Sequence, residues 1–140
     1  MPSDPLRMSV VPRKDALAPL LDAVESWSAT AGLAPEAAYR LALVVEELAV
    51  NVASHGAQGA DGAAALSVAI ARQGDAVRLV VEDDGRPFDP LSLPVPDTDL
   101  PLESRRIGGL GVHLSRRLSR SLSYAREGGR NRVVVVLDLA

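Results

Sequence analysis

The chain has 140 residues and a formal net charge of −3 at pH 7, a length that predicts a single domain over residues 1–140. Hydrophobic residues make up 47% of the sequence, which is enough for a buried core and excludes disorder of the whole chain. The absence of cysteine excludes disulfides and thiolate chemistry, and 3% aromatic residues are too few for base stacking, so direct nucleic-acid binding is not expected.

The sequence contains no recognisable membrane-spanning segment or secretory signal. No stretch approaches the ~18 consecutive apolar residues of a membrane span, and the N-terminus lacks the basic and apolar regions of a signal peptide. We therefore expect a cytoplasmic protein without membrane contact. Its charge is uneven, because residues 105–132 hold eight arginines and one acid, Glu127. Such a basic stretch favours a phosphate ligand or an acidic partner, or else a solvated helix face.

The first half of the chain predicts one strand and two helices. Residues 6–11 are typical of a strand, and residues 14–31 have the apolar spacing of a helix. Pro35 opens a second helix, which the pattern extends to His55. On that helix Leu43 and Val50 form a second apolar stripe, opposite the face that packs on the sheet. Either the first helix covers this stripe, or it is a protein interface.

The second half predicts two hairpins separated by a long loop. Strands over residues 64–72 and 76–83 are joined by a turn at Gly74, and strands over 122–126 and 132–139 close the chain. Five prolines make residues 85–111 irregular, and a helix is expected over 112–121. This order of elements predicts an α+β fold, with helices packed on one face of a sheet.

Two acidic residues, Glu47 and Asp83, are candidates for a functional site. On the second helix Glu47 and Asn51 are four residues apart, at the edge of the sheet-facing arc, whereas Glu46 projects outward. A carboxylate beside a carboxamide supplies a base and a metal ligand, although the pair is also common on ordinary helix surfaces. Asp83 follows the inward face of its strand, where its carboxylate needs a partner, either a ligand amine or a backbone turn.

A glycine-rich segment, Gly108-Gly109-Leu110-Gly111, directly precedes the third predicted helix. Glycines allow close backbone approach, and a helix N-terminus offers free N–H groups, which together favour an anion. The segment is not a Walker A loop, because no Lys-Ser/Thr follows it, and it lacks the third glycine of the dinucleotide fingerprint. Taken alone, it is a weak indication of phosphate binding.

These motifs occur together in a characteristic order. Glu-x-x-x-Asn lies in residues 47–56, Asp-x-Gly in 83–90, Gly-x-Gly in 108–114, and a closing hairpin covers 124–132. In this order they resemble the GHKL ATP-binding family, and within it the small anti-sigma-factor serine/threonine kinases. The resemblance covers nearly the whole chain. It implies a two-layer α/β sandwich with a mixed, mostly antiparallel sheet.

The resemblance also implies roles for individual residues. Glu47 falls at the general base that deprotonates a substrate serine, Asn51 at the Mg²⁺ ligand, and Asp83 at the carboxylate that accepts the adenine amino group. Residues 89–107 become an ATP lid. The further nucleotide contacts are Gly85, Gly109, Leu110 and Gly111, to which we add Arg105 and Arg106 at the end of the lid.

The implied function is a Mg²⁺- and ATP-dependent serine/threonine kinase. It would phosphorylate a STAS-domain anti-sigma-factor antagonist and otherwise sequester a sigma factor, as a homodimer. Two departures from the family pattern leave an alternative open, a nucleotide-gated binding regulator without phosphoryl transfer: Pro87 replaces a glycine, and residues 133–136 lack a threonine. The ATPase domain of a two-component histidine kinase is a third reading, disfavoured because no helical segment with a phosphoacceptor histidine is visible.

Overall fold

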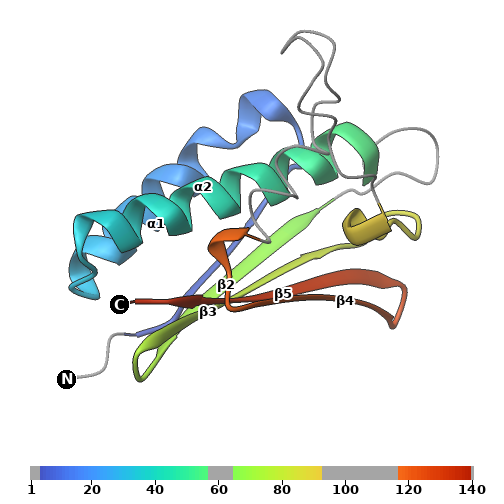
Figure 1. Ribbon diagram of the computed structural model, residues 1–140. Coiled ribbons are helices and arrows are strands. Elements are labelled where there is room, and N and C mark those ends of the chain that lie inside the picture. The colour runs from blue at the N-terminus through green and yellow to red at the C-terminus, as the bar shows by residue number, and fades with distance from the viewer. Residues whose placement is uncertain (1–3, 57–64, 93–116, 140) are drawn as a thin grey trace, which may run out of the picture.

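The computed structural model describes residues 4–56, 65–92 and 117–139. Five strands form one sheet in the order β1-β2-β3-β5-β4, and all four strand pairings are antiparallel. Figure 1 shows helices α1 and α2 side by side on one face of this sheet. The α+β, two-layer architecture expected from the sequence is confirmed. The strands are β1 (Leu6–Val10), β2 (Leu66–Gln73), β3 (Ala76–Asp83), β4 (Ser121–Glu127) and β5 (Arg130–Asp138).

Both predicted hairpins are present, with ends moved by one or two residues. β2 and β3 pair along their full length, from Leu66 opposite Asp83 to Gln73 opposite Ala76. The turn between them contains Gly74 at φ 62°, and the β4–β5 turn contains Gly128 and Gly129 at φ 55° and 75°. Two-residue hairpin turns require such positive φ values, which glycine adopts without steric cost.

The first predicted helix is shorter than its apolar pattern suggested. Lys14–Ala16 form a separate 3₁₀ turn, and α1 runs only over Ala18–Thr30. Pro19 explains the break, because proline lacks the N–H that a helix interior needs and is tolerated only in the first turn.

The second helix begins at the predicted proline and ends earlier than predicted. Helix α2 covers Pro35–Asn51, and a single π-type turn, Val52–Gly56, replaces the expected helical end at His55. The wider turn follows directly after Asn51, a residue of the candidate site, which is a frequent position for π-type turns.

The third predicted helix is wrong at its C-terminal end, and residues 112–116 of it lie outside the described residues. Arg117 and Leu118 are helical, but β4 has begun by Ser121. The backbone N–H of Arg120 already donates to the carbonyl of Val136, at 2.7 Å. The alternation of small polar and apolar residues from Ser121 onward suits a strand, and pairing with β5 overrides the helical pattern.

The core lies between the two helices and the inner face of the sheet. Trp27, the only tryptophan of the chain, is buried and donates from Nε1 to the carbonyl of Asp4, at 2.8 Å. The fully buried side chains include Leu20, Val24, Leu41, Val44, Leu48 and, from the sheet, Leu66, Ile70, Leu79 and Val135.

Among the described residues, no helix is long and apolar enough to cross a membrane.

Candidate functional site

The C-terminal half of α2 carries the first part of the candidate site. Glu46 is exposed, Glu47 is half-buried, and Asn51 is only 2% exposed. The helical periodicity thus oriented the two glutamates correctly, with Glu46 toward solvent and Glu47 at the margin of the core. The proposed roles of Glu47 and Asn51 stay predictions.

The Glu47 carboxyl lies in an unusual electrostatic environment. Burial raises its pKa above the ordinary value, and the neighbouring charge of Glu46 raises it further. A carboxylate with a raised pKa holds a proton more tightly than a free glutamate does. Glu47 is therefore a better proton acceptor than an exposed carboxylate, which is what a general base requires.

The same shift predicts a pH-dependent gain in stability for Glu47→Gln. A raised pKa means that the folded protein favours the protonated carboxyl, so the charge of Glu47 disfavours folding above its folded pKa. We expect Glu47→Gln to unfold at a higher temperature than wild type at pH 7. The gain should vanish once the pH falls below the unfolded pKa of about 4.5, where both forms are neutral. Trp27 emission measures the transition, and a gain that is independent of pH would contradict the assignment.

Asn51 is a buried amide without a partner. Within the described part of the chain, neither its Oδ1 nor its Nδ2 makes a hydrogen bond, and the buried hydroxyl of Ser54 also lacks one. An unsatisfied buried polar group costs about 1–3 kcal/mol. Such a cost is commonly found where a ligand, an ion or water completes the site.

Asp83 is the last residue of β3 and lines the same cavity as Asn51. It is 6% exposed, and its Oδ1 accepts hydrogen bonds from the backbone N–H of Gly85 and from Nδ2 of Asn131, both at 3.0 Å. The backbone turn that the sequence offered as one partner is therefore present. Within the described residues, Asp83 accepts both of these hydrogen bonds through Oδ1, which leaves Oδ2 available to a ligand.

Asn131 organises this end of the sheet, and the sequence analysis did not single it out. Its Nδ2 donates to Asp83 Oδ1 and to the carbonyl of Arg86, at 2.7 Å, while its Oδ1 accepts from the Tyr124 hydroxyl, at 2.6 Å, and from the N–H of Phe88, at 3.1 Å. These four bonds use the full capacity of a carboxamide. Asn131 is 2% exposed and shares the inward face of β5 with valines, which is the signal that could have revealed it.

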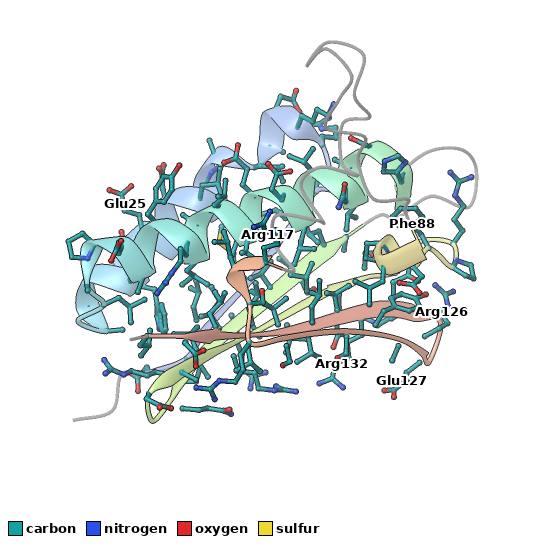
Figure 2. All side chains as sticks on the ribbon, viewed as in Figure 1. Glu25, Phe88, Arg117, Arg126, Glu127 and Arg132 are labelled. Carbon is teal, nitrogen blue, oxygen red and sulfur yellow. The ribbon has the colours of Figure 1, made fainter. Side chains whose placement is uncertain are left out.

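The turn after β3 is held from several sides. Arg126 of β4 donates to the carbonyl of Gly85, at 2.7 Å, and Arg86 donates to the carbonyl of His55, at 2.9 Å. The rings of His55 and Phe88 stack, with centroids 5.0 Å apart. Figure 2 shows Phe88 and Arg126 at the same end of the molecule. The turn therefore links the end of α2 to the β4–β5 hairpin.

These elements enclose a small cavity. Its walls come from α2, β3, β5 and the segment after β3, and its volume is about 20 Å³, room for a water molecule but not for a purine ring. A nucleotide base can enter only if the cavity widens. The polar groups that line the cavity are those of Asn51, Asp83 and Asn131.

Part of the predicted site lies outside the described residues. This applies to the phosphate-binding residues Gly109, Leu110 and Gly111, to Arg105 and Arg106, and to residues 93–107 of the predicted lid. Within the described part of the lid, Pro90–Ser92 form a short 3₁₀ turn. Of the predicted site residues that the structure describes, Asn51 and Asp83 line one cavity and Gly85 donates to Asp83, whereas Glu47 lies one helical turn before Asn51 on α2 and does not line that cavity.

Comparison with known families identifies the class of this fold. The model of the histidine kinase-like ATPase domain matches residues 10–137, so the chain belongs to that family. The GHKL-type ATP-binding fold inferred from the motifs is thereby confirmed. No curated protein matches the chain.

Solved structures with a similar fold come from several bacteria. The RsbU and RsbW domains of Rv1364c from Mycobacterium tuberculosis match with a TM-score of 0.70 and 18% identity, over 99% of this chain and 33% of that one. The SiaB–SiaC complex from Pseudomonas aeruginosa matches with a TM-score of 0.60 and 21% identity, over 94% and 88%. A blue-light activated histidine kinase of Erythrobacter litoralis matches at 0.55 and 23%, over 76% and 32%. The chain thus spans about a third of the first and third of these proteins.

Proposed function

We propose that this protein is a Mg²⁺- and ATP-dependent serine/threonine protein kinase of the anti-sigma-factor type. Its substrate would be a serine of a STAS-domain antagonist, and in partner switching it would otherwise hold a sigma factor, as a homodimer. The observation that carries the proposal is a buried amide, Asn51, that has no hydrogen-bond partner among the described residues and shares a cavity with the Asp83 carboxylate, with the half-buried Glu47 one turn before it on α2.

Glu47 is the proposed general base, which accepts the proton of the substrate hydroxyl. The carboxylate is partly shielded from water, its pKa is raised, and it does not line the cavity that holds Asn51 and Asp83. A substrate serine can therefore reach it from solvent. Because the reaction needs mainly positioning and charge neutralisation, such a small set of groups is sufficient for phosphoryl transfer.

Asn51 is the proposed protein ligand of a magnesium ion. Its buried Oδ1 has no hydrogen-bond donor within the described residues, and amide oxygens are hard ligands of the kind that Mg²⁺ accepts. Bound Mg²⁺ would supply charge neutralisation at the phosphates. Across the described residues, no group of three or more His, Asp or Glu is placed to hold a metal alone, so the phosphates and water would complete the coordination.

Asp83 is the proposed acceptor for the adenine amino group. Gly85 and Asn131 both occupy Oδ1, which fixes the rotation of the carboxylate and leaves Oδ2 directed to the ligand. Because the cavity that Asp83 shares with Asn51 is smaller than a purine, binding requires the cavity to widen. The second candidate function, a regulator that binds nucleotide to change its partner affinity without transferring phosphate, is supported instead by Pro87 in place of a glycine and by the lack of a threonine in residues 133–136.

The two functions are distinguished by transfer to a cognate antagonist. The test incubates the protein with ATP labelled at the γ-phosphate and with a STAS-domain protein encoded beside it. Label that appears on the antagonist, and is lost when its acceptor serine is replaced by alanine, supports the kinase. Nucleotide-dependent binding of the antagonist without label supports the regulator.

Asn51→Leu is expected to separate stability from function. Leucine has the same branched shape and the same number of side-chain heavy atoms and leaves no polar atom unsatisfied, so the unliganded protein should be stabilised by about 1–2 kcal/mol. The same variant should lose the dependence of nucleotide binding on Mg²⁺. Thermal unfolding with ADP, with and without EDTA, measures both effects. A destabilised variant that retains the metal dependence would show that Asn51 is a structural residue.

A further inference from the structure

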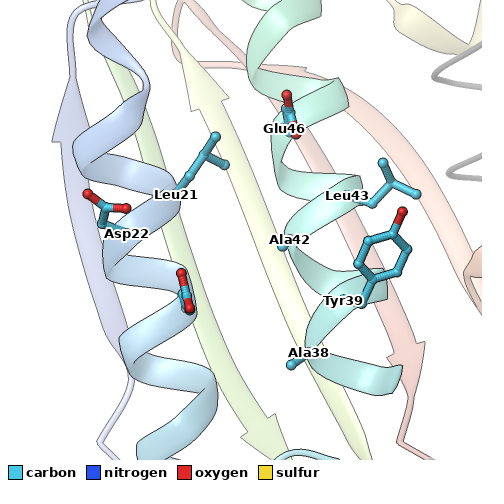
Figure 3. Close-up of a pocket in the computed structure, with 8 residues that line it drawn as sticks. Leu21, Asp22, Ala38, Tyr39, Ala42, Leu43 and Glu46 are labelled. Atoms are coloured by element: carbon cyan, nitrogen blue, oxygen red, sulfur yellow. The ribbon is translucent and has the colours of Figure 1, made fainter. Parts of the chain in front are cut away.

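The outer surface of α1 and α2 carries a groove away from the candidate nucleotide site. Its volume is about 450 Å³, within the range of protein binding pockets. Its floor consists of Ala38 and Ala42 of α2, and Leu21 of α1 bounds it. Figure 3 shows Leu21 pointing toward α2, with Ala38 and Ala42 facing it. The small alanine side chains create the depression because they leave the space between the helices unfilled.

The groove has an apolar floor and an acidic rim. Leu21 and Leu43 are half-buried, and Tyr39 beside them is 69% exposed. The carboxylates of Asp22, Glu25 and Glu46 also line the groove, while no basic side chain lines it among the described residues. Leu43 belongs to the second apolar stripe predicted from the sequence, and the structure shows that α1 leaves it partly uncovered.

The charge of the two helices is strongly one-sided. α1 and α2 together carry five carboxylates and one guanidinium, that of Arg40. Arg40 donates to the carbonyl of Asp138 instead and does not line the groove. An anionic ligand such as a nucleic acid or an acidic lipid would be repelled here. Two copies of this face would repel each other in the same way, which argues against a symmetric dimer through the groove.

The geometry of the groove suits a helix. Ala38, Ala42 and Glu46 are spaced by four residues, as are Leu21 and Glu25, so the groove follows two aligned ridges of neighbouring helices. From Ala38 to Glu46, eight steps along the helix, it extends about 12 Å along α2. A helix of two to three turns can lie along it, with aliphatic side chains on the alanines and basic side chains against the rim.

We propose that the α1–α2 groove is a docking site for a basic amphipathic helix of a partner protein. The groove ends at Glu46, next to the candidate base Glu47, and the charge of Glu46 contributes to the raised pKa of Glu47. A cationic side chain paired with Glu46 would offset that charge. Docking would thereby lower the raised pKa of the candidate base Glu47. The docking site itself does not depend on the proposed kinase activity.

The direct test measures binding of a synthetic helical peptide by fluorescence anisotropy. The probe has about five turns, with leucines at every third or fourth position and lysines on both flanks. The control peptide carries glutamine in place of each leucine and the same lysines. We expect saturable binding of the leucine peptide alone. Equal binding of both peptides, or no binding at millimolar concentration, would overturn the proposal.

Groove variants locate the binding. Ala42→Leu fills the floor with a good helix former and should weaken binding at least about tenfold, since the displaced contact is worth more than one buried methylene. Glu25→Gln should weaken it about threefold. Glu36→Gln removes an exposed carboxylate of α2 that does not line the groove, and should leave affinity unchanged. Equal losses in Glu25→Gln and Glu36→Gln would indicate non-specific attraction and overturn the proposal.

A chemical test is independent of affinity changes. Because the chain contains no cysteine, Ala42→Cys and Ser123→Cys each provide one thiol, the second on an exposed position of β4. The leucine peptide should slow alkylation at position 42 and leave position 123 unaffected. Equal protection at both positions contradicts the groove. If sedimentation of the unliganded protein shows self-association that Ala42→Leu abolishes, the occupant is a second copy, and the partner assignment falls.

Discussion

Asp83→Asn is expected to remove most of the thermal stabilisation that Mg-ADP gives the wild-type protein. At a hundredfold excess of nucleotide over its Kd, binding to the folded state adds about 2.7 kcal/mol, or roughly 10 °C in Tm for a chain of this size. Asparagine retains an Oδ1 for Gly85 and Asn131 but turns Oδ2 into an amino group. A donor would then face the adenine amino group, so the charge-assisted acceptor is lost.

The matched control is Asp84→Asn, which removes one negative charge from the next residue. Asp84 is exposed and accepts a hydrogen bond from the N–H of Ala65, at 3.1 Å, away from the cavity. Its nucleotide-induced shift should equal that of wild type. Without nucleotide, Asp83→Asn should lower the free energy of unfolding by only about 1–2 kcal/mol, because neutral hydrogen bonds replace charged ones. A full shift in Asp83→Asn would reduce Asp83 to a turn residue.

Glu47→Gln is expected to lower the rate of phosphoryl transfer to an antagonist by about 10²–10⁴, the usual contribution of a general base. Glutamine keeps the size of the side chain but cannot take up the serine proton. The nucleotide-induced shift in Tm should be retained, because Glu47 does not line the cavity that contains Asp83. Single-turnover transfer with labelled ATP measures the rate.

Glu46→Gln is the control for charge on the same helix. Glu46 is exposed, and its charge is the smaller of the two causes that raise the pKa of Glu47, so the transfer rate should change only a few-fold. Equal losses in the two variants would mean that the carboxylates act through their combined charge. Loss of nucleotide binding in Glu47→Gln would assign the residue to binding rather than to proton transfer.

Local periodicity was sufficient to predict the parts of the site that lie within single elements. The helical period placed Glu47 at the core margin and Glu46 in solvent, and the strand period placed Asp83 on the inward face. Both inferences need only one element, because side-chain direction repeats every 3.6 or every two residues. The roles of these residues remain predictions, and the family match supports the ATP-binding fold that contains them.

Features that depend on contacts between distant segments could not be predicted. Asn131 pairs with Asp83 because β5 lies beside β3, and no pattern within β5 reveals that neighbour. The pairing of β4 with β5 likewise extends β4 back to Ser121 and shortens the predicted helix. The hydrogen bonds of Asn131 to the turn, and the stacking of Phe88 on His55, also determine the small cavity, so its size could not be inferred from the motifs.

The adjacency of β3 and β5 has a consequence for how the chain tolerates change. Asp83 and Asn131 face each other although they are 48 positions apart in the sequence, whereas the two hairpins close through local turns. The entropy of closing a loop grows only logarithmically, by about 0.6 kcal/mol for each doubling of length. Doubling the length of chain between Asp83 and Asn131 would therefore add only this small cost to the pairing of β3 with β5, so the register of these two strands depends little on how long the connection between them is.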